Sequence, residues 1–313
     1  MTTLDRLDGW KAVGVIGPAQ HQVFSAIVRK ERFSVYLELS ALLYLGVLCF
    51  VGGVGWTFRE YVTNLGDGAI ITTLSLMVAA TFYYCFSTAE PYDSDETESP
   101  NLAFDYVLYL GCLLLSAEVA YLQYRFEMFR SWHHHLLIGT VVFALLAYRF
   151  DNRFVLSMAL SSLAAWLGLR IDGVTGQSSD ALRATAFLYG AVIAGAGALL
   201  YREDIKAHFF QVYLHLAANV VLAAAASGIG EPSLGLAYLA ALVALSAAAI
   251  MLGVRFGSFA FVAYGILYGY GGISYKLLEA IGDPTAAMFY FMVTGIFVIG
   301  LLVVLARRFG RDE

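Results

Sequence analysis

AAMFYFMVTGIFVIGLLVVLA, residues Ala286 to Ala306, contains no charged side chain and is long enough to cross a bilayer as a helix. A helix needs about 20 apolar residues to span some 30 Å of hydrocarbon. Nine other apolar stretches of comparable length precede this one. The ten predicted spans are 36–58, 68–86, 103–124, 134–149, 153–169, 184–201, 207–228, 234–252, 257–278 and 286–306.

The length of these stretches decides the fold class. Backbone groups inside hydrocarbon must find hydrogen-bond partners within the protein, so only helices and closed barrels can span a membrane. Barrel strands alternate polar and apolar residues over about ten positions, which these unbroken runs do not do. Apolar residues make up 60% of the chain and charged residues 14%, which argues against a water-soluble enzyme. The sequence predicts an all-α, polytopic transmembrane helix bundle.

The stretches 134–149 and 153–169 are short and flank the polar sequence RFDNR at Arg149–Arg153. They either cross the membrane as two spans or form a tight hairpin that does not cross it fully. The prediction is therefore ten spans, with eight as the alternative.

Lys and Arg resist translocation, so their distribution predicts the orientation. A cytoplasmic N-terminus places thirteen of them on the inner side and six on the outer side. With an even number of spans, both termini are cytoplasmic. The predicted parts are a cytoplasmic amphipathic helical segment at 1–33, the transmembrane bundle at 34–308 and a cytoplasmic tail at 309–313.

Residues 1–33 lack the apolar core of a cleavable signal peptide and carry several charges. Apolar residues recur at helical spacing on both sides of the turn Gly14–Pro18, which predicts two short amphipathic helices. These helices would pack on each other or lie on the inner membrane surface.

The loop at 90–100 contains five carboxylates and no cation. A solvated, mobile loop is the favoured interpretation, and a divalent-cation site is the alternative. Residues 1–33 and the acidic loop 90–98 are also the predicted docking surfaces for protein partners, beside the lipid bilayer itself.

Several segments in the first 170 residues resemble a known family. They are the short helical N-terminus with its Gly-Val-Ile turn, LLYLG at Leu42–Gly46, GGVG at Gly52–Gly55, and YRFDNRF at Tyr148–Phe154 before a span with Trp166. In pattern and order they are similar to the predicted bacterial membrane proteins grouped as a domain of unknown function. This resemblance implies a location in the bacterial inner membrane. It brings no established activity or catalytic residues.

Glu118 is an ionisable residue well inside a predicted span, where such a group costs a few kcal/mol. Tyr121 and Arg125 follow at i+3 and i+7, on the same helix face. Glu118 is therefore either a protonatable coupling site or the partner of Arg125 or of a neighbouring helix.

The seventh span carries a polar stripe of His208, Gln211, His215 and Asn219, whose spacing places all four on one side of a helix. Imidazoles titrate near neutral pH and can relay protons. The stripe is either a substrate or proton pathway, or a set of interhelical hydrogen bonds.

The ninth span concentrates glycine and tyrosine. Gly265, Gly269 and Gly272 predict close helix packing, and Tyr264 and Tyr268 lie on an adjacent face. The alternative is a broken helix whose exposed carbonyls contact a substrate.

His133, His134 and His135 are adjacent, so on a helix they point about 100° apart and cannot readily share one metal ion. Cys49, Cys85 and Cys112 have no paired spacing. We predict no metal, no cofactor and no nucleic-acid partner, because the corresponding motifs are absent from the sequence.

Three functional classes fit these features. A transporter or permease for a small molecule or ion is favoured, and it predicts that Glu118, His215, Asn219 and Tyr268 converge on one cavity. A non-catalytic subunit or scaffold of a membrane complex is the alternative, and it predicts that these groups are satisfied pairwise. A lipid-directed intramembrane enzyme is the least favoured, because few carboxylates lie near the histidines.

Overall fold

The computed structural model of the chain describes residues 3–18, 20–21, 24–25, 45–47, 49, 52–53, 66–97, 99–129, 133–175 and 178–312. Within these residues the regular elements are all helices. They are α1 (Thr3–Ala12), α4 (Asp67–Thr88), α5 (Leu102–Phe126), α6 (His134–Phe150), α7 (Arg153–Thr175), α8 (Ser179–Arg202), the 3₁₀ turn η1 (Ala207–Phe209), α9 (Phe210–Ser227), α10 (Gly235–Phe256), α11 (Phe259–Ile281) and α12 (Pro284–Asp312).

The predicted spans after residue 60 each coincide with one of these helices to within a few residues. Seven helices in the described part of the chain are long and apolar enough to cross a membrane: α4, α5, α7, α8, η1 with α9, α10 and α12. Helix α6 is shorter, at 17 residues. The predicted first span, 36–58, lies almost wholly outside the described residues. The chain is thus an all-helical membrane protein that contacts the lipid bilayer, and the count of ten remains a prediction.

Local sequence signals set the helix boundaries. Asn101 caps α5 by accepting a hydrogen bond from the Phe104 N–H (3.0 Å), and Asn152 caps α7 in the same way through Val155 (2.9 Å). Helix α10 ends at Gly257, whose φ of +68° few residues other than glycine adopt readily. These caps let successive helices reverse direction within a few residues.

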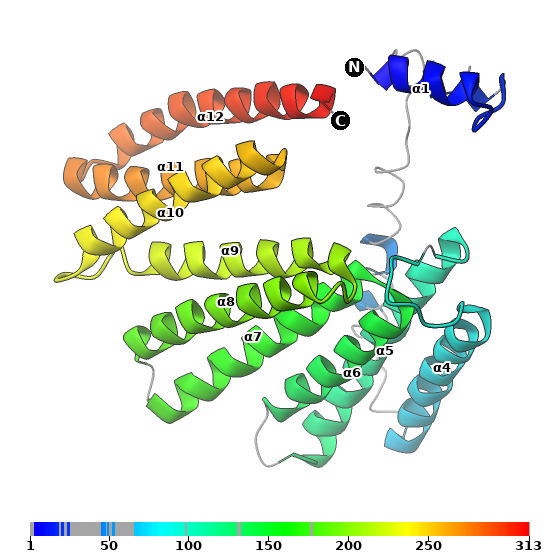
Figure 1. The fold of residues 1–313 in the computed structure, drawn as a ribbon. Coiled ribbons are helices and arrows are strands. Elements are labelled where there is room, and N and C mark those ends of the chain that lie inside the picture. Colours follow the sequence, from blue (N-terminus) through cyan, green and yellow to red (C-terminus); the bar gives the residue numbers. More distant parts are fainter. Residues whose placement is uncertain are drawn as a thin grey trace.

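Consecutive helices pack as antiparallel hairpins, α4 with α5, α6 with α7, α8 with α9, and α10 with α11. Figure 1 shows them arranged in sequence order from α4 at one side to α12 at the other. Because the hairpins alternate, residues 89–101, 151–152, 203–206 and 257–258 lie at one end of the bundle. We call this the inner end, since the charge count predicts that it faces the cytoplasm, and the opposite end the outer end.

The main core joins α4, α5, α6, α7, α8 and α9. Its most buried members include Leu108, Cys112, Ala147 and Val155, each with no exposed surface. A smaller cluster attaches α10 to α9 through Leu222, Ala225, Ile229 and Leu242. The bundle therefore consists of a central group of helices with α10–α12 added along α9.

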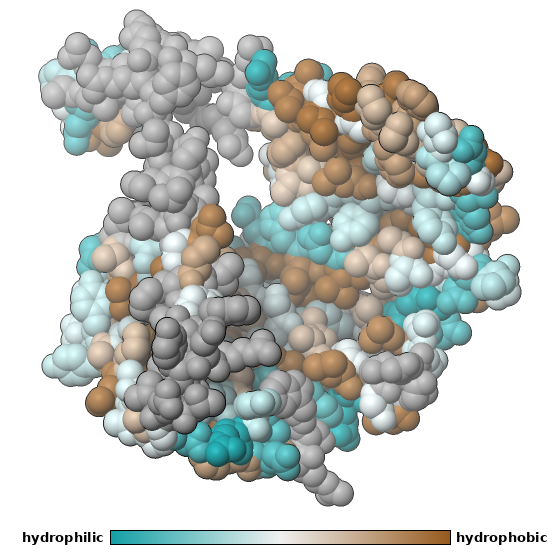
Figure 2. Space-filling view, turned by 180° about the vertical axis from the view of Figure 1, so that it is seen from behind, coloured by the Kyte–Doolittle hydropathy of each residue, from teal (hydrophilic) through white to brown (hydrophobic). Residues whose placement is uncertain are grey.

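Helix α12 has no buried residue in its apolar window. Its large side chains, among them Phe289, Met292, Ile296 and Phe297, are more than half exposed. Hydrophobic residues cover much of the outer surface at this side of the molecule (Figure 2). An exposed apolar helix of this length is suited to lipid rather than to water.

The chain turns near residue 14, between two helical pieces. Helix α1 is followed by Gly14 at a φ of +80°, and the described residues from Pro18 to Ser25 are helical. His21 contacts Asp8 at 2.8 Å and ties the two helical pieces together. The position of this segment on the membrane surface remains a prediction.

Candidate functional site

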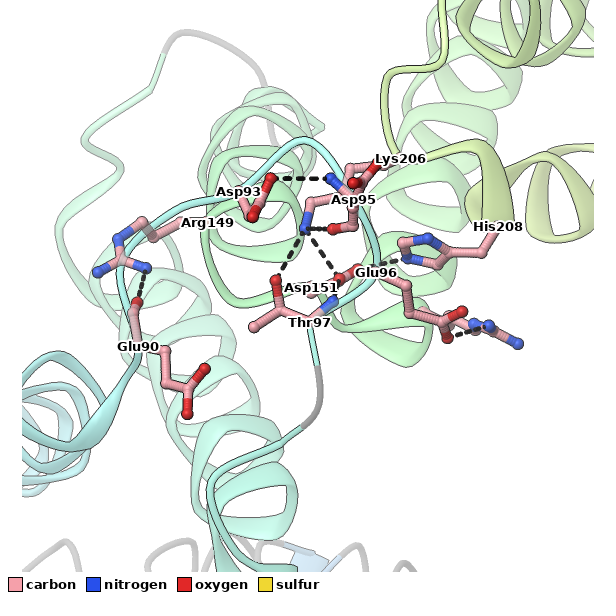
Figure 3. A network of polar contacts seen from close by, with 10 residues as sticks. Glu90, Asp93, Asp95, Glu96, Thr97, Arg149, Asp151, Lys206 and His208 are labelled. Atoms are coloured by element: carbon pink, nitrogen blue, oxygen red, sulfur yellow. Dashed lines mark hydrogen bonds and ion pairs between the residues drawn. The ribbon is translucent and has the colours of Figure 1, made fainter. Parts of the chain in front are cut away.

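A buried cluster of polar residues at the inner end of the bundle is centred on Asp151. This residue ends α6 in the left-handed conformation, with a φ of +54°, and turns the chain directly into α7. Its carboxylate is 3% exposed and accepts hydrogen bonds from Lys206 Nζ (2.8 Å) and the Thr97 N–H (2.6 Å). It also contacts the ring of His208. One carboxylate thus joins three segments distant in sequence (Figure 3).

Lys206 lies in the connection between α8 and α9, and its side chain is 1% exposed. Besides the bond to Asp151, its ammonium donates to the Asp95 carbonyl (2.7 Å) and lies 3.5 Å from Thr97 Oγ1. Three acceptors match the three N–H donors of a lysine. The ammonium also faces the ring of Tyr92 at 5.5 Å. We call Asp95, Thr97, Asp151, Lys206 and His208 the inner polar centre.

This centre fixes the acidic loop. The Lys206 N–H donates to the Ser94 carbonyl at 3.0 Å, Arg149 donates to the Glu90 carbonyl at 3.0 Å, and Arg153 pairs with Glu96 at 2.5 Å. The sequence predicts a solvated, mobile loop, and in the structure these contacts hold the loop against the bundle. Its main chain is anchored at several points by cations that lie 55 or more residues away in the sequence (Figure 3). Its carboxylates at Glu90, Asp93, Asp95 and Glu96 remain exposed.

The contacts of the inner polar centre fit a structural role better than a catalytic one. The carboxylate and the ammonium have their hydrogen-bonding capacity filled by the protein itself. A cavity of about 20 Å³ beside them, lined by Tyr92, Phe104 and Arg149 among others, holds about one water molecule. The inner polar centre therefore locks the inner ends of α6, α7, α8 and α9 together.

The four residues of the predicted polar stripe on α9 have different surroundings in the structure. His208 joins the inner polar centre, and Gln211 is exposed. His215 stacks on Phe261 of α11, with ring centroids 4.5 Å apart, and its Nδ1 is buried without a partner. Asn219 donates to the His215 carbonyl within the same helix, at 2.9 Å.

Glu118 lies apart from that stripe. Its carboxylate accepts a hydrogen bond from Ser75 of α4. Arg125, one of its predicted partners, instead pairs with Asp67 at 2.7 Å, and Tyr121 donates to the same carboxylate at 2.9 Å. These contacts close the α4–α5 hairpin, so Glu118 belongs to a different part of the bundle from His215.

Gly265, Gly269 and Gly272 of α11 lie against α10. A Cβ at Gly265 would lie 2.4 Å from the Ser246 carbonyl oxygen, and one at Gly272 would lie 2.5 Å from Leu242 Cδ2. At Gly269 the corresponding approach, to Ser246, is 3.4 Å. Helix α11 is continuous through this region, and the broken helix considered for these residues does not occur.

Tyr264 and Tyr268 of α11 pack against the cluster that joins α9 to α10. Tyr264 also meets the ring of His215 edge to face, at 5.7 Å, while Tyr268 adds to the same apolar contact. The structure thus brings His215 and Tyr264 together but places neither beside Glu118.

A second charged cluster lies at the outer end and was not predicted. Arg183 of α8 is 6% exposed and pairs with Asp180 and Glu231, both at 2.6 Å. Its guanidinium also lies 5.2 Å from the ring of Tyr238. The α8–α9 hairpin is therefore fixed by buried cations at both of its ends.

A cavity with an apolar lining lies between α8, α9 and α10. It has a volume of about 420 Å³, and all of its lining residues are apolar. The walls include Phe187, Ala191 and Ala194 of α8, Leu214 and Leu222 of α9, Leu245, Ala248 and Leu252 of α10, and Phe261 of α11. We call it the α8–α10 groove.

This groove opens sideways. Ala191 is exposed and Leu252 is 39% exposed, so lipid can reach the cavity between α8 and α10. From Phe187 to Ala194 it extends about 10 Å along the helix axis, at 1.5 Å per residue. The signal for it in the sequence is the set of small residues on facing helices, of which Gly190 allows the closest approach, to Val221.

The histidine triplet forms no metal site in the described structure. His133 and His134 stack with ring centroids 4.8 Å apart. Burial lowers the pKa of His133, and the neighbouring histidines add to this effect. No group of His, Cys, Asp and Glu in the described part of the chain has a geometry suited to a metal ion.

Comparison with known proteins adds one match. No curated protein and no solved structure matches the chain. The family model that does match spans residues 8–156, which include the acidic loop and the Asp151 turn but neither Lys206 nor the α8–α10 groove. The resemblance seen in the sequence is thus confirmed over residues 8–156, which match the family described as predicted membrane protein (DUF2157).

Proposed function

We propose that this protein is a permease-type membrane protein that holds an amphiphilic small molecule by its apolar part in the α8–α10 groove. The observation that carries this proposal is the uniformly apolar lining of a cavity of about 420 Å³ that opens sideways between candidate spans. Pockets for small molecules are typically of this size and character. A molecule can enter such a groove from the bilayer without passing through water.

The positions of the polar residues narrow the substrate class. An ion or a sugar would need a continuous set of polar groups across the bundle. Glu118 is bonded within the α4–α5 hairpin and His208 within the inner polar centre. A hydrophilic pathway through these residues would have to break both contacts. A molecule with an apolar body and a polar head does not need a continuous polar pathway across the bundle.

The test measures movement of a lipid between leaflets. Purified protein is reconstituted into liposomes with a trace of NBD-labelled phospholipid, and dithionite is added to bleach the outer leaflet. We expect bleaching to proceed beyond the outer-leaflet fraction with the native chain and to stop there with Ala248→Trp, which fills the groove.

The matched control is Ala247→Trp, which makes the same change at an exposed neighbouring position that does not line the groove. It should behave like the native chain. Equal bleaching of native, variant and protein-free liposomes would overturn the permease role.

A second candidate function, as a subunit of a membrane assembly, is favoured by the anchored acidic loop. Four exposed carboxylates on a fixed main chain suit a basic segment of a partner protein. Replacing Asp93 and Asp95 with Asn removes two charges and leaves the Asp95 carbonyl that binds Lys206 in place. If this role holds, chemical cross-linking in the native membrane should join the native chain to a specific second polypeptide. This cross-linked product should be absent with the Asp93 and Asp95 variant and present with Ala248→Trp.

A further inference from the structure

Resting on the proposed function, we propose further that the occupant of the α8–α10 groove is an anionic phospholipid of the bilayer, held by its acyl chain in the groove and by its headgroup at Arg202 and Arg255. This proposal names the polar end of the ligand, which the apolar lining alone does not determine.

The two arginines flank the inner end of the groove. Arg202 is the last residue of α8 and lies eleven positions after Ala191, which places both within about 20° on the helix. Arg255 follows the lining residue Leu252 by three positions on α10, so the two are neighbours on that helix. Both side chains are exposed. The proposed headgroup lies at the inner ends of α8 and α10, where each helix exposes one guanidinium group.

Arg202 and Arg255 differ from the cations that hold the acidic loop. Arg149, Arg153 and Lys206 are bonded to the acidic loop or to Asp151. Among the described residues, neither Arg202 nor Arg255 forms an ion pair with a carboxylate. Their guanidinium groups are thus available to a phosphate, which arginine binds with two parallel hydrogen bonds.

Two acidic residues also lie near the inner end of the groove. Glu203 and Asp204 follow Arg202 in the connection to α9, where Asp204 takes a left-handed turn with a φ of +53°. They lie beyond the helix end, whereas Arg202 is still within it. On the α10–α11 side the connection is Gly257 and Ser258, which carry no charge. Gln211, exposed at the start of α9, adds an uncharged donor at the same level.

The test compares two lipids with identical acyl chains. The full chain is placed in nanodiscs of equal phosphatidylglycerol and phosphatidylcholine, and the lipids that remain after stepwise removal of bulk lipid are counted by native mass spectrometry. A basic side chain near an anionic headgroup contributes about 1 kcal/mol, or roughly a fivefold preference. We expect the native chain to retain phosphatidylglycerol, and this preference to fall about fivefold in Arg202→Gln and again in the double variant with Arg255→Gln.

The control is Arg307→Gln with Arg308→Gln, which removes two exposed arginines from the inner part of α12. This variant should keep the preference, because these residues do not adjoin the groove. If it loses the preference as well, the effect is general surface charge and the headgroup site is overturned.

Different results would contradict the proposed groove and the proposed headgroup site. Equal retention of the two lipids by the native chain, abolished by Ala248→Trp, would leave the groove standing and overturn the anionic preference. A preference for phosphatidylglycerol that Ala248→Trp leaves unchanged would mean that the acyl chain lies elsewhere. Absence of any retained lipid would overturn both the headgroup site and the occupancy on which the proposed function rests.

Discussion

Asp151 and Lys206 show how two residues can organise one end of a membrane bundle. Each is almost completely buried, and each takes a left-handed backbone conformation that places its side chain toward the other. Their charges are satisfied by each other, by Thr97 and by the loop carbonyl of Asp95. A buried ion pair of this kind is tolerated only when its remaining hydrogen bonds are also made.

Lys206→Met should destabilise the protein by about 3–5 kcal/mol, because it leaves the Asp151 carboxylate buried without its ammonium partner. Adding Asp151→Asn should recover part of this loss, since no buried charge then remains. Arg153→Met is the control on the same loop. Its ion pair with Glu96 is about half exposed, so the cost should be below about 1 kcal/mol. Denaturant unfolding in detergent measures all three.

Glu118 provides the second prediction at this scale. Because Ser75 already satisfies its carboxylate within the α4–α5 hairpin, we expect Glu118→Gln to keep that hydrogen bond and leave leaflet exchange of the labelled lipid unchanged. Loss of exchange in this variant, with unfolding unaltered, would indicate that Glu118 takes part in transport.

At the scale of elements, the contact between α10 and α11 depends on glycine. A methyl group at Gly265 would press on the Ser246 carbonyl oxygen, which is backbone and cannot move independently. Gly265→Ala should therefore cost about 1–3 kcal/mol through overpacking. The comparison is Gly271→Ala on the same helix, which has open space around it. That change should be neutral or stabilise by up to about 1 kcal/mol, because alanine favours helix over glycine.

The elements also show what the sequence could predict. Helix positions from α4 onward followed from hydropathy, since a span in lipid makes its backbone hydrogen bonds internally and needs no knowledge of its neighbours. The inner polar centre and the groove could not be predicted in this way. Asp151 and Lys206 are 55 residues apart, and the walls of the groove come from four helices. The chemical types of His208 and His215 were recognised, but their partners are set by tertiary packing.

At the scale of the whole molecule, the orientation in the membrane can be tested directly. With its native cysteines replaced, a single cysteine is introduced at Asp283, at the outer end, or at Asp93, in the acidic loop. In intact cells we expect a membrane-impermeant maleimide to label Asp283→Cys, and Asp93→Cys to react only after permeabilisation. The reverse pattern would mean that the inner end faces outward, and the headgroup site would then lie in the other leaflet.

The proposed function requires an alkyl chain to occupy the space between α8, α9 and α10. Photo-crosslinking with a diazirine-bearing fatty acid, followed by mass spectrometric mapping of the labelled residues, tests it most directly. We expect labelling to concentrate on groove residues such as Ala191 and Leu252, to fall strongly in Ala248→Trp and to stay unchanged in Ala247→Trp. Labelling spread evenly over the lipid-exposed surface, including α12, and insensitive to Ala248→Trp would contradict it.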